Sequence, residues 1–399
     1  MDWSFLIRNK SSLPVSTDSR NLPAGCVFFA LHGETFDGNQ FAAEALKKGA
    51  SLAVVDNEQI FGTLPEGKAL LVPDTLLALQ ELARDWRREL GITVIGITGT
   101  NGKTTTKELT AAVLKTKFNL LYTQGNLNNS IGVPQTVLKM TREHNLALIE
   151  MGASHPGDIT ELVNICEPNC GLITNVGKAH LLGFGSFEGV MNTKKELYDY
   201  LRAHGGFCFR NLDNPFLTEM AGDLKTVPYH TGTMLTGTHL VGDYNSENIQ
   251  AALCVGEYFG ISLEEGEAAI RTYKPDNNRS QLLKTSRNTV VVDAYNANVT
   301  SMTASIEAFL GDTLILGDML ELGEYSTAEH QHIVDLLKQK GYTSVYLVGN
   351  EFAKTDCDFY KYSSAEQLRL SLALHPLSGR TILLKGSHGI HLEKLIEVL

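Results

Sequence analysis

Short apolar runs rich in β-branched residues alternate along this chain with longer segments whose apolar positions recur at helical spacing. Residues 94–98 and 171–176 predict buried strands, whereas residues 104–117 and 187–203 predict helices. In the last third, strands are predicted at 289–293, 313–316, 345–348 and 381–384, and helices at 301–310, 327–340, 365–374 and 391–399. Strict alternation of apolar strands with helices predicts an α/β fold built on a parallel, doubly wound sheet.

Two breaks in this pattern suggest domain boundaries. A helix that Asp74 caps ends at Gly91, and the polar segment KPDNNR at residues 274–279 has the composition of a linker. A chain of 399 residues is long enough for two or three domains. We predict a small N-terminal α/β domain at 1–90, a central domain with a mononucleotide-binding parallel sheet at 91–276, and a Rossmann-like C-terminal domain at 277–399.

The stretch VIGITGTNGKTTTK at residues 94–107 carries the clearest chemical signal. A β-run leads into a glycine loop, and Lys103 and Thr104 then open a helix, so that backbone N–H groups and the positive helix end converge on one point. The pattern G-x-x-x-x-G-K-[ST] is missed by one residue, because Ile97 stands where its first glycine belongs. An ordinary βα turn is the alternative, but the flanking strand and helix favour a phosphate loop. Its predicted phosphate-binding residues are Thr98, Gly99, Thr100, Asn101, Gly102, Lys103, Thr104 and Thr105.

An acidic residue and a group of amides follow predicted strands of the same domain. Glu150 ends an apolar run at 147–151, where a phosphate-loop protein places a Mg²⁺ ligand, although a surface or helix-cap acid is the alternative. Asn126, Asn128 and Asn129 lie in a loop between apolar segments. Such clusters form turns, and they can also contact a polar substrate.

Other polar residues have two interpretations each. His180 lies in a glycine-flanked loop after a predicted strand. It is either a ligand or a structural histidine. Lys194 and Lys195 lie on a predicted helix, where surface lysines are ordinary. Arg20 beside Ser19 could hold a phosphate or a sugar hydroxyl, or could be a surface arginine.

Composition narrows the class of protein. The formal charge of −11 argues against nucleic-acid binding, which requires basic patches. Six cysteines without a C-x-x-C pair are typical of free thiols in a reducing cytosol. Neither a signal peptide nor an apolar stretch of membrane-spanning length is apparent. We expect a cytoplasmic monomer that acts on Mg²⁺–nucleoside triphosphate, and kinase, ligase and mechanical ATPase remain open at this point.

Longer motifs then indicate a family. TDSR and FFALHGETFDGNQF occur in the first part, and TGTNGKTTTKEL, GNLNNSIGVP, IEMGASHPGDI, TNVGKAHLLGFGSFEGV and KKELYDYL occur in the second. DAYNAN, GDMLELGE and LLKGSHGIHLE occur in the third. With these motifs the chain closely resembles the Mur ligase family over nearly its whole length.

The resemblance implies an ATP-dependent amide ligation in peptidoglycan precursor synthesis. ATP phosphorylates the terminal carboxylate of UDP-MurNAc-tripeptide, and the amine of D-Ala-D-Ala attacks the acyl phosphate. The products are UDP-MurNAc-pentapeptide, ADP and phosphate. A sibling ligase of the same fold is the near alternative, and a nucleotide-binding regulatory or scaffold protein that has lost catalysis is the distant one.

The resemblance also implies residue roles. Lys103 binds the β- and γ-phosphates, Thr104 and Glu150 hold a first Mg²⁺, His180 ligates a second Mg²⁺, and a carbamoylated Lys194 binds or orients that second ion. The implied catalytic residues are thus Lys103, His180 and Lys194.

Residues outside this centre take binding roles by the same resemblance. Asn245 and Asn248 lie by the adenine. Arg279 and Asp293 reach the nucleotide when the domains close about residues 274–279. The remaining residues bind the two other substrates. Those on the D-Ala-D-Ala side are Asn296, Asn298 and Asp318, and those on the UDP-sugar peptide are Ser19, Arg20, Asn126, Asn128 and Asn129. Four residues depart from the family pattern: Tyr244 for histidine, Lys195 for glycine, Val299 for proline and His388 for arginine.

Overall fold

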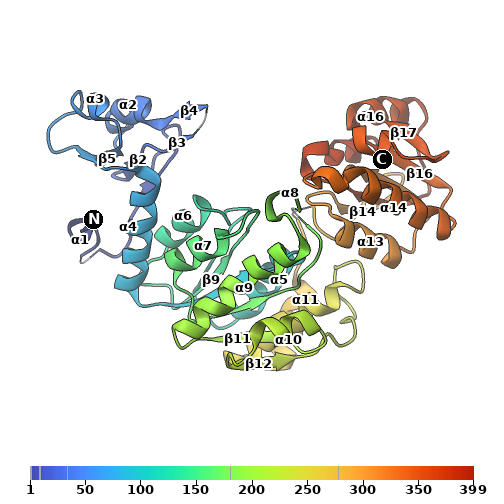
Figure 1. The fold of residues 1–399 in the computed structure, drawn as a ribbon, viewed down its shortest axis with the longest axis horizontal. Helices are drawn as coiled ribbons and strands as arrows, with labels where there is room; N and C mark the ends of the chain where they lie inside the picture. The colour runs from blue at the N-terminus through green and yellow to red at the C-terminus, as the bar shows by residue number, and fades with distance from the viewer. Residues whose placement is uncertain (1, 9, 34, 180, 277) are drawn as a thin grey trace.

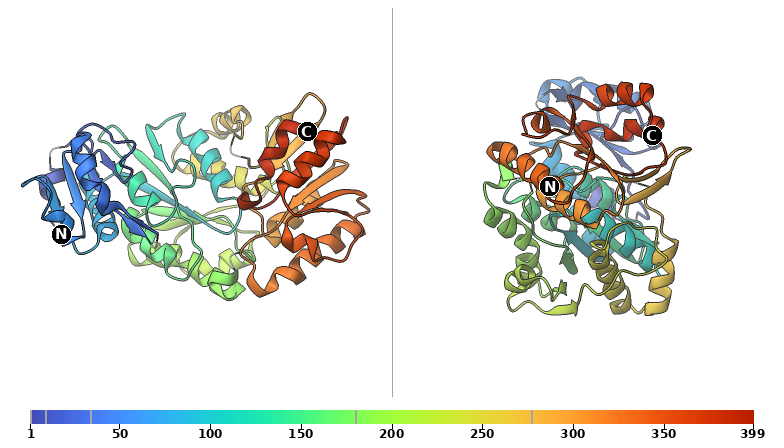
Figure 2. Two further views of the ribbon diagram at one scale, coloured as in Figure 1. Left: turned by 90° about the horizontal axis from the view of Figure 1, so that it is seen from above. Right: turned by 90° about the vertical axis from the view of Figure 1, so that its right-hand side faces the viewer.

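Three α/β units follow one another in the computed structural model, which describes residues 2–8, 10–33, 35–179, 181–276 and 278–399. The N-terminal unit (blue in Figure 1) and the C-terminal unit (red) lie at opposite ends of the central one. The view from above in Figure 2 shows the same linear arrangement. The α/β class predicted from the sequence is confirmed.

The first unit is a small parallel sheet with short helices. Its strand order is β1 (Val15–Ser16), β2 (Val27–Phe29), β5 (Leu52–Val55) and β6 (Ala69–Leu71), and β3 (His32–Gly33) pairs separately with β4 (Phe36–Asp37). Its helices are α1 (Ser4–Ile7), η1 (Gly38–Phe41), α2 (Ala42–Lys47), α3 (Glu58–Phe61) and α4 (Thr75–Leu90).

Helix α4 joins the first unit to the second. Asp74 accepts a hydrogen bond from the Leu77 N–H, and Gly91 ends the helix with φ of 63°, as the sequence predicts. The buried face of α4 packs on helices of the central unit, and the Trp86 indole N–H donates to the Met140 carbonyl (3.0 Å). One apolar core therefore crosses the boundary between these two units.

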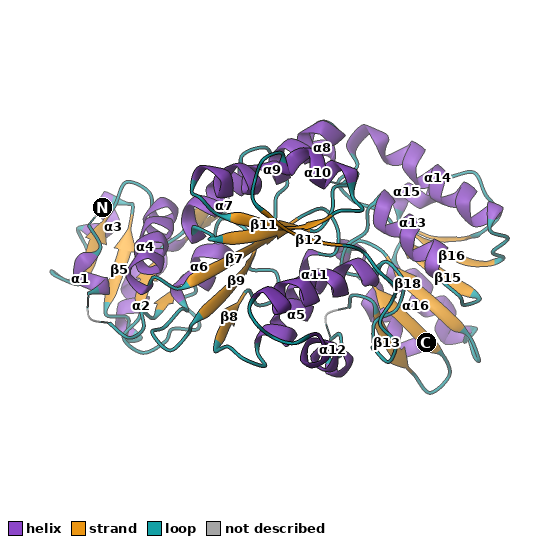
Figure 3. Ribbon diagram, turned by 90° about the horizontal axis from the view of Figure 1, so that it is seen from below, coloured by secondary structure: helices purple, strands orange, loops and turns teal. Residues whose placement is uncertain are grey.

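The central unit is a six-stranded, fully parallel sheet between two layers of helices (Figure 3). Its strand order is β12 (Thr226–Tyr229), β11 (Phe207–Asn211), β10 (Cys170–Ile173), β7 (Thr93–Thr98), β9 (Leu146–Glu150) and β8 (Leu120–Tyr122). One face carries α6 (Gly132–Leu138), α7 (Asp158–Cys166) and α9 (Phe187–Ala203), and the other carries α5 (Lys103–Leu114), α11 (Asn245–Tyr258) and α12 (Leu263–Thr272). The short helices α8 (Leu181–Phe184) and α10 (Pro215–Ala221) complete the unit.

The third unit is a second six-stranded sheet. Its order is β13 (Gln281–Lys284), β14 (Thr289–Asp293), β18 (Thr381–Lys385), β15 (Thr313–Gly317), β16 (Ser344–Val348) and β17 (Tyr360–Tyr362), with β13 alone antiparallel. Helices α13 (Val299–Ala308) and α14 (Ser326–Gln339) cover one face, and α16 (Ala365–Leu374) and η4 (Leu392–Val398) cover the other. The short elements are η2 (Gly323–Tyr325), α15 (Asn350–Ala353) and η3 (His388–Ile390).

The last segment differs from the sequence prediction. Residues predicted as an α-helix at 391–399 form the 3₁₀ turns of η4 instead. Among the described residues, no helix combines the length and the apolar character needed to cross a membrane.

Candidate active site

A cavity of about 890 Å³ lies where the carboxyl edges of the two large sheets meet. Loops after β7, β8, β9 and β10 form its wall in the central unit, and loops after β14, β15 and β18 form the facing wall. In open parallel sheets ligands bind outside the carboxyl ends of the strands, at the point where the strand order reverses. Strand β7 has β10 on one side and β9 on the other, so the loop after it lies at such a point.

The loop after β7 requires glycine at two positions. Gly99 has φ of 142°, and a Cβ there would lie 2.0 Å from the Thr174 hydroxyl oxygen. Gly102 has φ of 76°, and a Cβ there would lie 2.4 Å from Oδ1 of Asn248. Any other residue would be strained at these angles and would displace its neighbour. The glycines thus hold the loop tightly around the start of α5.

Residues that the sequence did not single out shape the same loop. The Asn101 N–H donates to Oδ1 of Asn175 (2.9 Å), and the Thr174 hydroxyl donates to the Asn101 carbonyl (2.6 Å). Both partners follow β10, which pairs with β7 in the sheet. The sequence analysis places both residues inside the strand predicted at 171–176, and only the observed strand order shows that they lie next to the loop.

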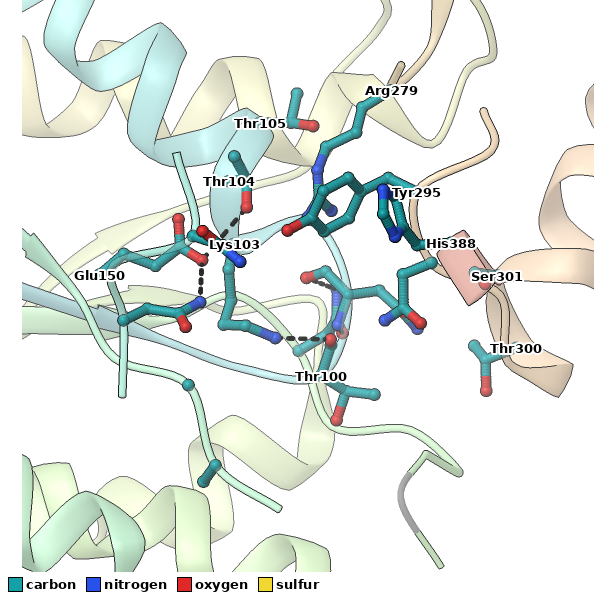
Figure 4. A pocket seen from close by; sticks show the side chains of 18 of the residues that line it. Thr100, Lys103, Thr104, Thr105, Glu150, Arg279, Tyr295, Thr300, Ser301 and His388 are labelled. Carbon is teal, nitrogen blue, oxygen red and sulfur yellow. Dashed lines mark hydrogen bonds between the residues drawn. The ribbon is translucent and has the colours of Figure 1, made fainter. Parts of the chain in front are cut away.

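Lys103 folds back over the loop that precedes it. Its Nζ donates to the carbonyl oxygens of Gly99 (2.8 Å) and Thr100 (2.9 Å), as Figure 4 shows in part. Burial, which outweighs the opposing charge of Glu150 and is aided by nearby Arg279, lowers the pKa of Lys103 to about 8. Two carbonyl dipoles, which interact weakly with the ammonium, therefore hold it at the loop. The oxygen atoms of a bound anion can replace these carbonyls as its partners.

Glu150 ends β9 with its side chain buried, 1% exposed, facing the start of α5. Its Oε1 accepts hydrogen bonds from the Thr104 hydroxyl (3.1 Å) and the Asn128 amide (2.8 Å) (Figure 4). Among the residues that the structure describes, its Oε2 has no hydrogen-bond partner, and the Lys107 ammonium is 3.9 Å away. A buried carboxylate oxygen without a donor, beside a threonine hydroxyl, suits a hard cation such as Mg²⁺. The alternative of a surface or helix-cap acid is wrong.

The two adjacent lysines of α9 have different surroundings. Lys194 is 2% exposed, and its Nζ lies 3.5 Å from the Ala153 carbonyl in the loop after β9. Burial, reinforced by the charge of Lys103, holds the pKa of Lys194 well below its usual range. Lys195 points outward and pairs with Asp199 at 2.7 Å. Helical geometry therefore separates a buried amine from an ordinary surface cation, which composition could not do.

His180 lies outside the described residues. Within the described parts of the chain, no group of three or more histidine, cysteine, aspartate or glutamate side chains could hold a metal ion.

Asn245 and Asn248 form a buried network behind the phosphate loop. Asn248 Oδ1 accepts from the Thr106 hydroxyl (2.9 Å), and its amide donates to Asn245 Oδ1 (3.0 Å). Both residues also line the cavity. Tyr244, the departure beside them, places its hydroxyl 3.0 Å from that of Ser280.

Third-unit residues near the strand ends form the facing wall. The Arg279 guanidinium lies 4.0 Å from the centre of the Tyr295 ring, and Asp293 accepts from the buried Lys385 ammonium (2.5 Å). Asn296 and His388 also line the cavity. Tyr295 and Lys385 were not singled out from the sequence.

Asp318 and Asn298 differ from expectation. The Asp318 carboxylate is 3% exposed, accepts from the N–H groups of Glu351 and Phe352 (both 2.9 Å), and is absent from the cavity lining. The Asp318 side chain caps the start of α15, whereas Leu320 and Glu321 of the same loop line the cavity. That the Asp318 loop faces D-Ala-D-Ala therefore stays a prediction. Asn298 caps α13 and reaches toward Asn101 rather than into the cavity. Val299, where the family pattern has proline, is the first residue of α13.

Ser19 and Arg20 lie apart from the cavity. Arg20 is exposed and makes two 2.9 Å hydrogen bonds to Asp18, which lower the pKa of that carboxyl to about 2. Asn126, Asn128 and Asn129 do line the cavity. Asn129 Oδ1 also accepts from the N–H of Gly132 (2.8 Å), which is the first residue of α6.

Comparisons with known proteins match all three units. The description "Mur ligase family, catalytic domain" matches residues 14–87, "Mur ligase middle domain" matches 97–234, and "Mur ligase, glutamate ligase domain" matches 278–388. A relative from Bacillus subtilis is 34% identical over 96% of this chain and 92% of its own length. One from Escherichia coli is 34% identical over 96% and 93%. The chain belongs to the Mur ligase family.

Within that family the similarity is to one kind of ligase. Both relatives are named UDP-N-acetylmuramoyl-tripeptide–D-alanyl-D-alanine ligase. The structure of MurF from Acinetobacter baumannii has a TM-score of 0.83 at 28% identity and covers 96% of this chain and 93% of that protein. MurF from Thermotoga maritima, solved in complex with ADP, has a TM-score of 0.84 at 27% identity and covers 97% of both.

Proposed function

We propose that this ligase joins D-Ala-D-Ala to the terminal carboxylate of UDP-MurNAc-tripeptide at the expense of ATP. The observation that carries the proposal is the cavity itself, because a phosphate-loop wall and a third-unit wall face each other across it. In this proposal the N-terminal domain (1–90) binds the nucleotide sugar and the central domain (91–276) binds ATP. The C-terminal domain (277–399) binds D-Ala-D-Ala. Because the reaction needs ATP and a nucleotide-linked precursor, we place the protein in the cytoplasm. We also expect it to act as a monomer.

Two bond exchanges account for the reaction. A carboxylate oxygen of the tripeptide attacks the γ-phosphorus, and the bond to the ADP oxygen breaks. The D-Ala-D-Ala amine then attacks the acyl carbon, loses a proton, and phosphate leaves. The Lys103 ammonium neutralises charge that develops on the transferred phosphoryl group, and Arg279 approaches it from the opposite wall.

Glu150 and Thr104 are proposed to hold a first Mg²⁺, because the Oε2 of Glu150 accepts no hydrogen bond from any described residue and is free to bind a cation. When bound, such an ion supplies charge neutralisation that one lysine cannot provide for two anionic reactants. We propose that His180 and Lys194 hold a second ion. For Lys194 the low pKa is the relevant property, because only a neutral amine adds to CO₂ and forms a carbamate, with release of a proton.

The pH dependence of nucleotide affinity follows from Lys103. Its pKa of about 8 lies below that of a free lysine, so the ammonium charge is lost as pH rises through 8 in the free protein. We expect the affinity for ADP without Mg²⁺ to fall by roughly tenfold between about pH 7 and pH 9. Calorimetric titration measures this, and Lys103→Met should show a flat profile. A flat profile in the unmodified protein would contradict the role of Lys103.

Closure of the third unit is expected when the ligands bind, because both walls of the cavity contribute residues. We place the hinge at about residues 274–279. Small-angle scattering with Mg²⁺, a non-hydrolysable ATP analogue and UDP-MurNAc-tripeptide should show a smaller radius of gyration than the free protein. An unchanged radius would count against closure.

Substrate exchange separates the proposed function from a sibling ligase. UDP-MurNAc-tripeptide with D-Ala-D-Ala should give a product of pentapeptide mass. The same assay with UDP-MurNAc and L-Ala, or with the shorter UDP-MurNAc peptides and D-Glu, L-Lys or meso-diaminopimelate, should give none. Product from any of these other pairs would reassign the enzyme within the family.

A further inference from the structure

Two asparagine side chains from different units form a reciprocal pair at the edge of the cavity. The Asn298 amide donates to Oδ1 of Asn101 (2.8 Å), and the Asn101 amide donates to Oδ1 of Asn298 (3.4 Å). Asn101 lies in the phosphate loop, and Asn298 is the N-cap residue of α13 in the third unit. The pair therefore joins the two walls of the cavity directly.

The Asn101 side chain is not needed to build its own loop. The backbone N–H and carbonyl of Asn101 are held by Asn175 and Thr174, whose contacts involve no atom of the Asn101 side chain. The loop backbone fixes where this amide points. An anion that orders the loop consequently orders the amide too.

Asn298 performs two separable tasks. Its Oδ1 accepts from the Ser301 N–H (2.9 Å), which caps α13, and its amide group reaches Asn101. It is 4% exposed, and it does not line the cavity. The two units also pack closely beside Asn298. A Cβ added to Gly177 of the central unit would lie only 3.0 Å from the Thr300 hydroxyl of the third unit.

We propose that Asn101 and Asn298 form a clasp that positions the third unit against the phosphate loop, so that nucleotide binding favours binding of the second substrate. Asn298 is on this account a positioning residue, without direct contact to D-Ala-D-Ala. The inference rests on the proposed function, because it takes the loop as the ATP site and the third unit as the D-Ala-D-Ala site.

The physical consequence is a population shift. A ligand that contacts both walls binds only the clasped arrangement, and its apparent affinity falls in proportion to the fraction of molecules in that arrangement. A ligand held by the phosphate loop alone has no such dependence. Breaking the clasp should therefore weaken D-Ala-D-Ala binding at saturating nucleotide while leaving ADP binding nearly unchanged.

Asn298→Ser tests this without loss of the cap, because serine is a good N-cap residue but is too short to reach Asn101. Asn101→Ala removes the other half of the pair and keeps the loop's backbone contacts. Each variant should raise the KM for D-Ala-D-Ala by about tenfold with saturating ATP. Asn298→Ser, which lies outside the phosphate loop, should change the Kd for Mg²⁺–ADP, measured alone, by less than about twofold.

The double variant distinguishes a clasp from direct substrate contact. Two residues that act only through each other are not additive, so Asn101→Ala with Asn298→Ser should raise KM by the same factor as either change alone. A multiplied loss, or a loss in Asn298→Ser without one in Asn101→Ala, would overturn the proposal. Glu329→Gln is the matched control, since it removes a 3.6 Å ion pair with Lys178 across the same two units, and it should leave KM unchanged.

Failure of the clasp can be told from failure of the proposed function. If the unmodified enzyme does not use D-Ala-D-Ala, the function proposal fails, and the clasp is then measured by scattering. With Mg²⁺–ADP bound, Asn298→Ser and Asn101→Ala should both have a larger radius of gyration than the unmodified protein. Radii equal to that of the unmodified protein would overturn the clasp independently of the substrate.

Discussion

Lys103→Met is expected to lower kcat/KM for ATP by about a thousandfold, because it removes the ammonium that meets the transferred phosphoryl group. In the structure this charge is held by two loop carbonyls and lies beside Glu150. The pKa of Lys103 is lowered by burial, so the charged form is disfavoured by its surroundings. Loss of the charge should therefore not lower the melting temperature, and loss of activity will not reflect unfolding.

Lys115→Met provides the matched control for Lys103. Lys115 follows the same helix, but it is exposed and lies 4.0 Å from the centre of the Tyr122 ring, away from the phosphate loop. Steady-state kinetics should show unchanged activity in this variant. A loss of less than about tenfold in Lys103→Met would exclude a central role in phosphoryl transfer.

Lys194→Ala is expected to reduce kcat by two to three orders of magnitude, and a short carboxylic acid such as acetate should restore part of it. The reason is that a carbamate on this buried amine acts as an anion, and a free carboxylate can occupy the space that the truncated side chain leaves. The neutral form that CO₂ addition requires is favoured because burial lowers the pKa of Lys194.

Lys195→Ala is the control at the next position, where the side chain pairs with Asp199 at the surface. It should retain full activity and gain nothing from acetate. Mass spectrometry of the intact protein under CO₂, after chemical trapping of carbamates, should locate the modification at Lys194. Activity of Lys194→Ala that acetate does not change would contradict the carbamate.

Local sequence was sufficient for the parts of the site that follow one strand. The phosphate loop and Glu150 were found because a strand leads directly into each of them, whereas only the family resemblance singled out Lys194 on its helix. Thr174 and Asn175 were missed because their place beside the phosphate loop depends on β10 pairing with β7. Strand order is a property of the whole sheet, and one sequence does not show it.

Side-chain direction was the second limit. Asp318 follows a strand at the edge of the cavity, as predicted, but its carboxylate turns to the N–H groups at the start of α15. Asn298 likewise lies in the expected loop and contacts another unit. The short edge strands β8, β12, β13 and β17 were not predicted, because runs of so few residues carry little periodic signal.

Phosphate release tests the central claim most directly, with ATP, Mg²⁺, UDP-MurNAc-tripeptide and D-Ala-D-Ala present together and each omitted in turn. We expect release only when all four are present, together with one pentapeptide product per phosphate. Release that does not require D-Ala-D-Ala, or that is faster with a free amino acid in its place, would contradict the proposed ligation and indicate an uncoupled ATPase or a sibling ligase.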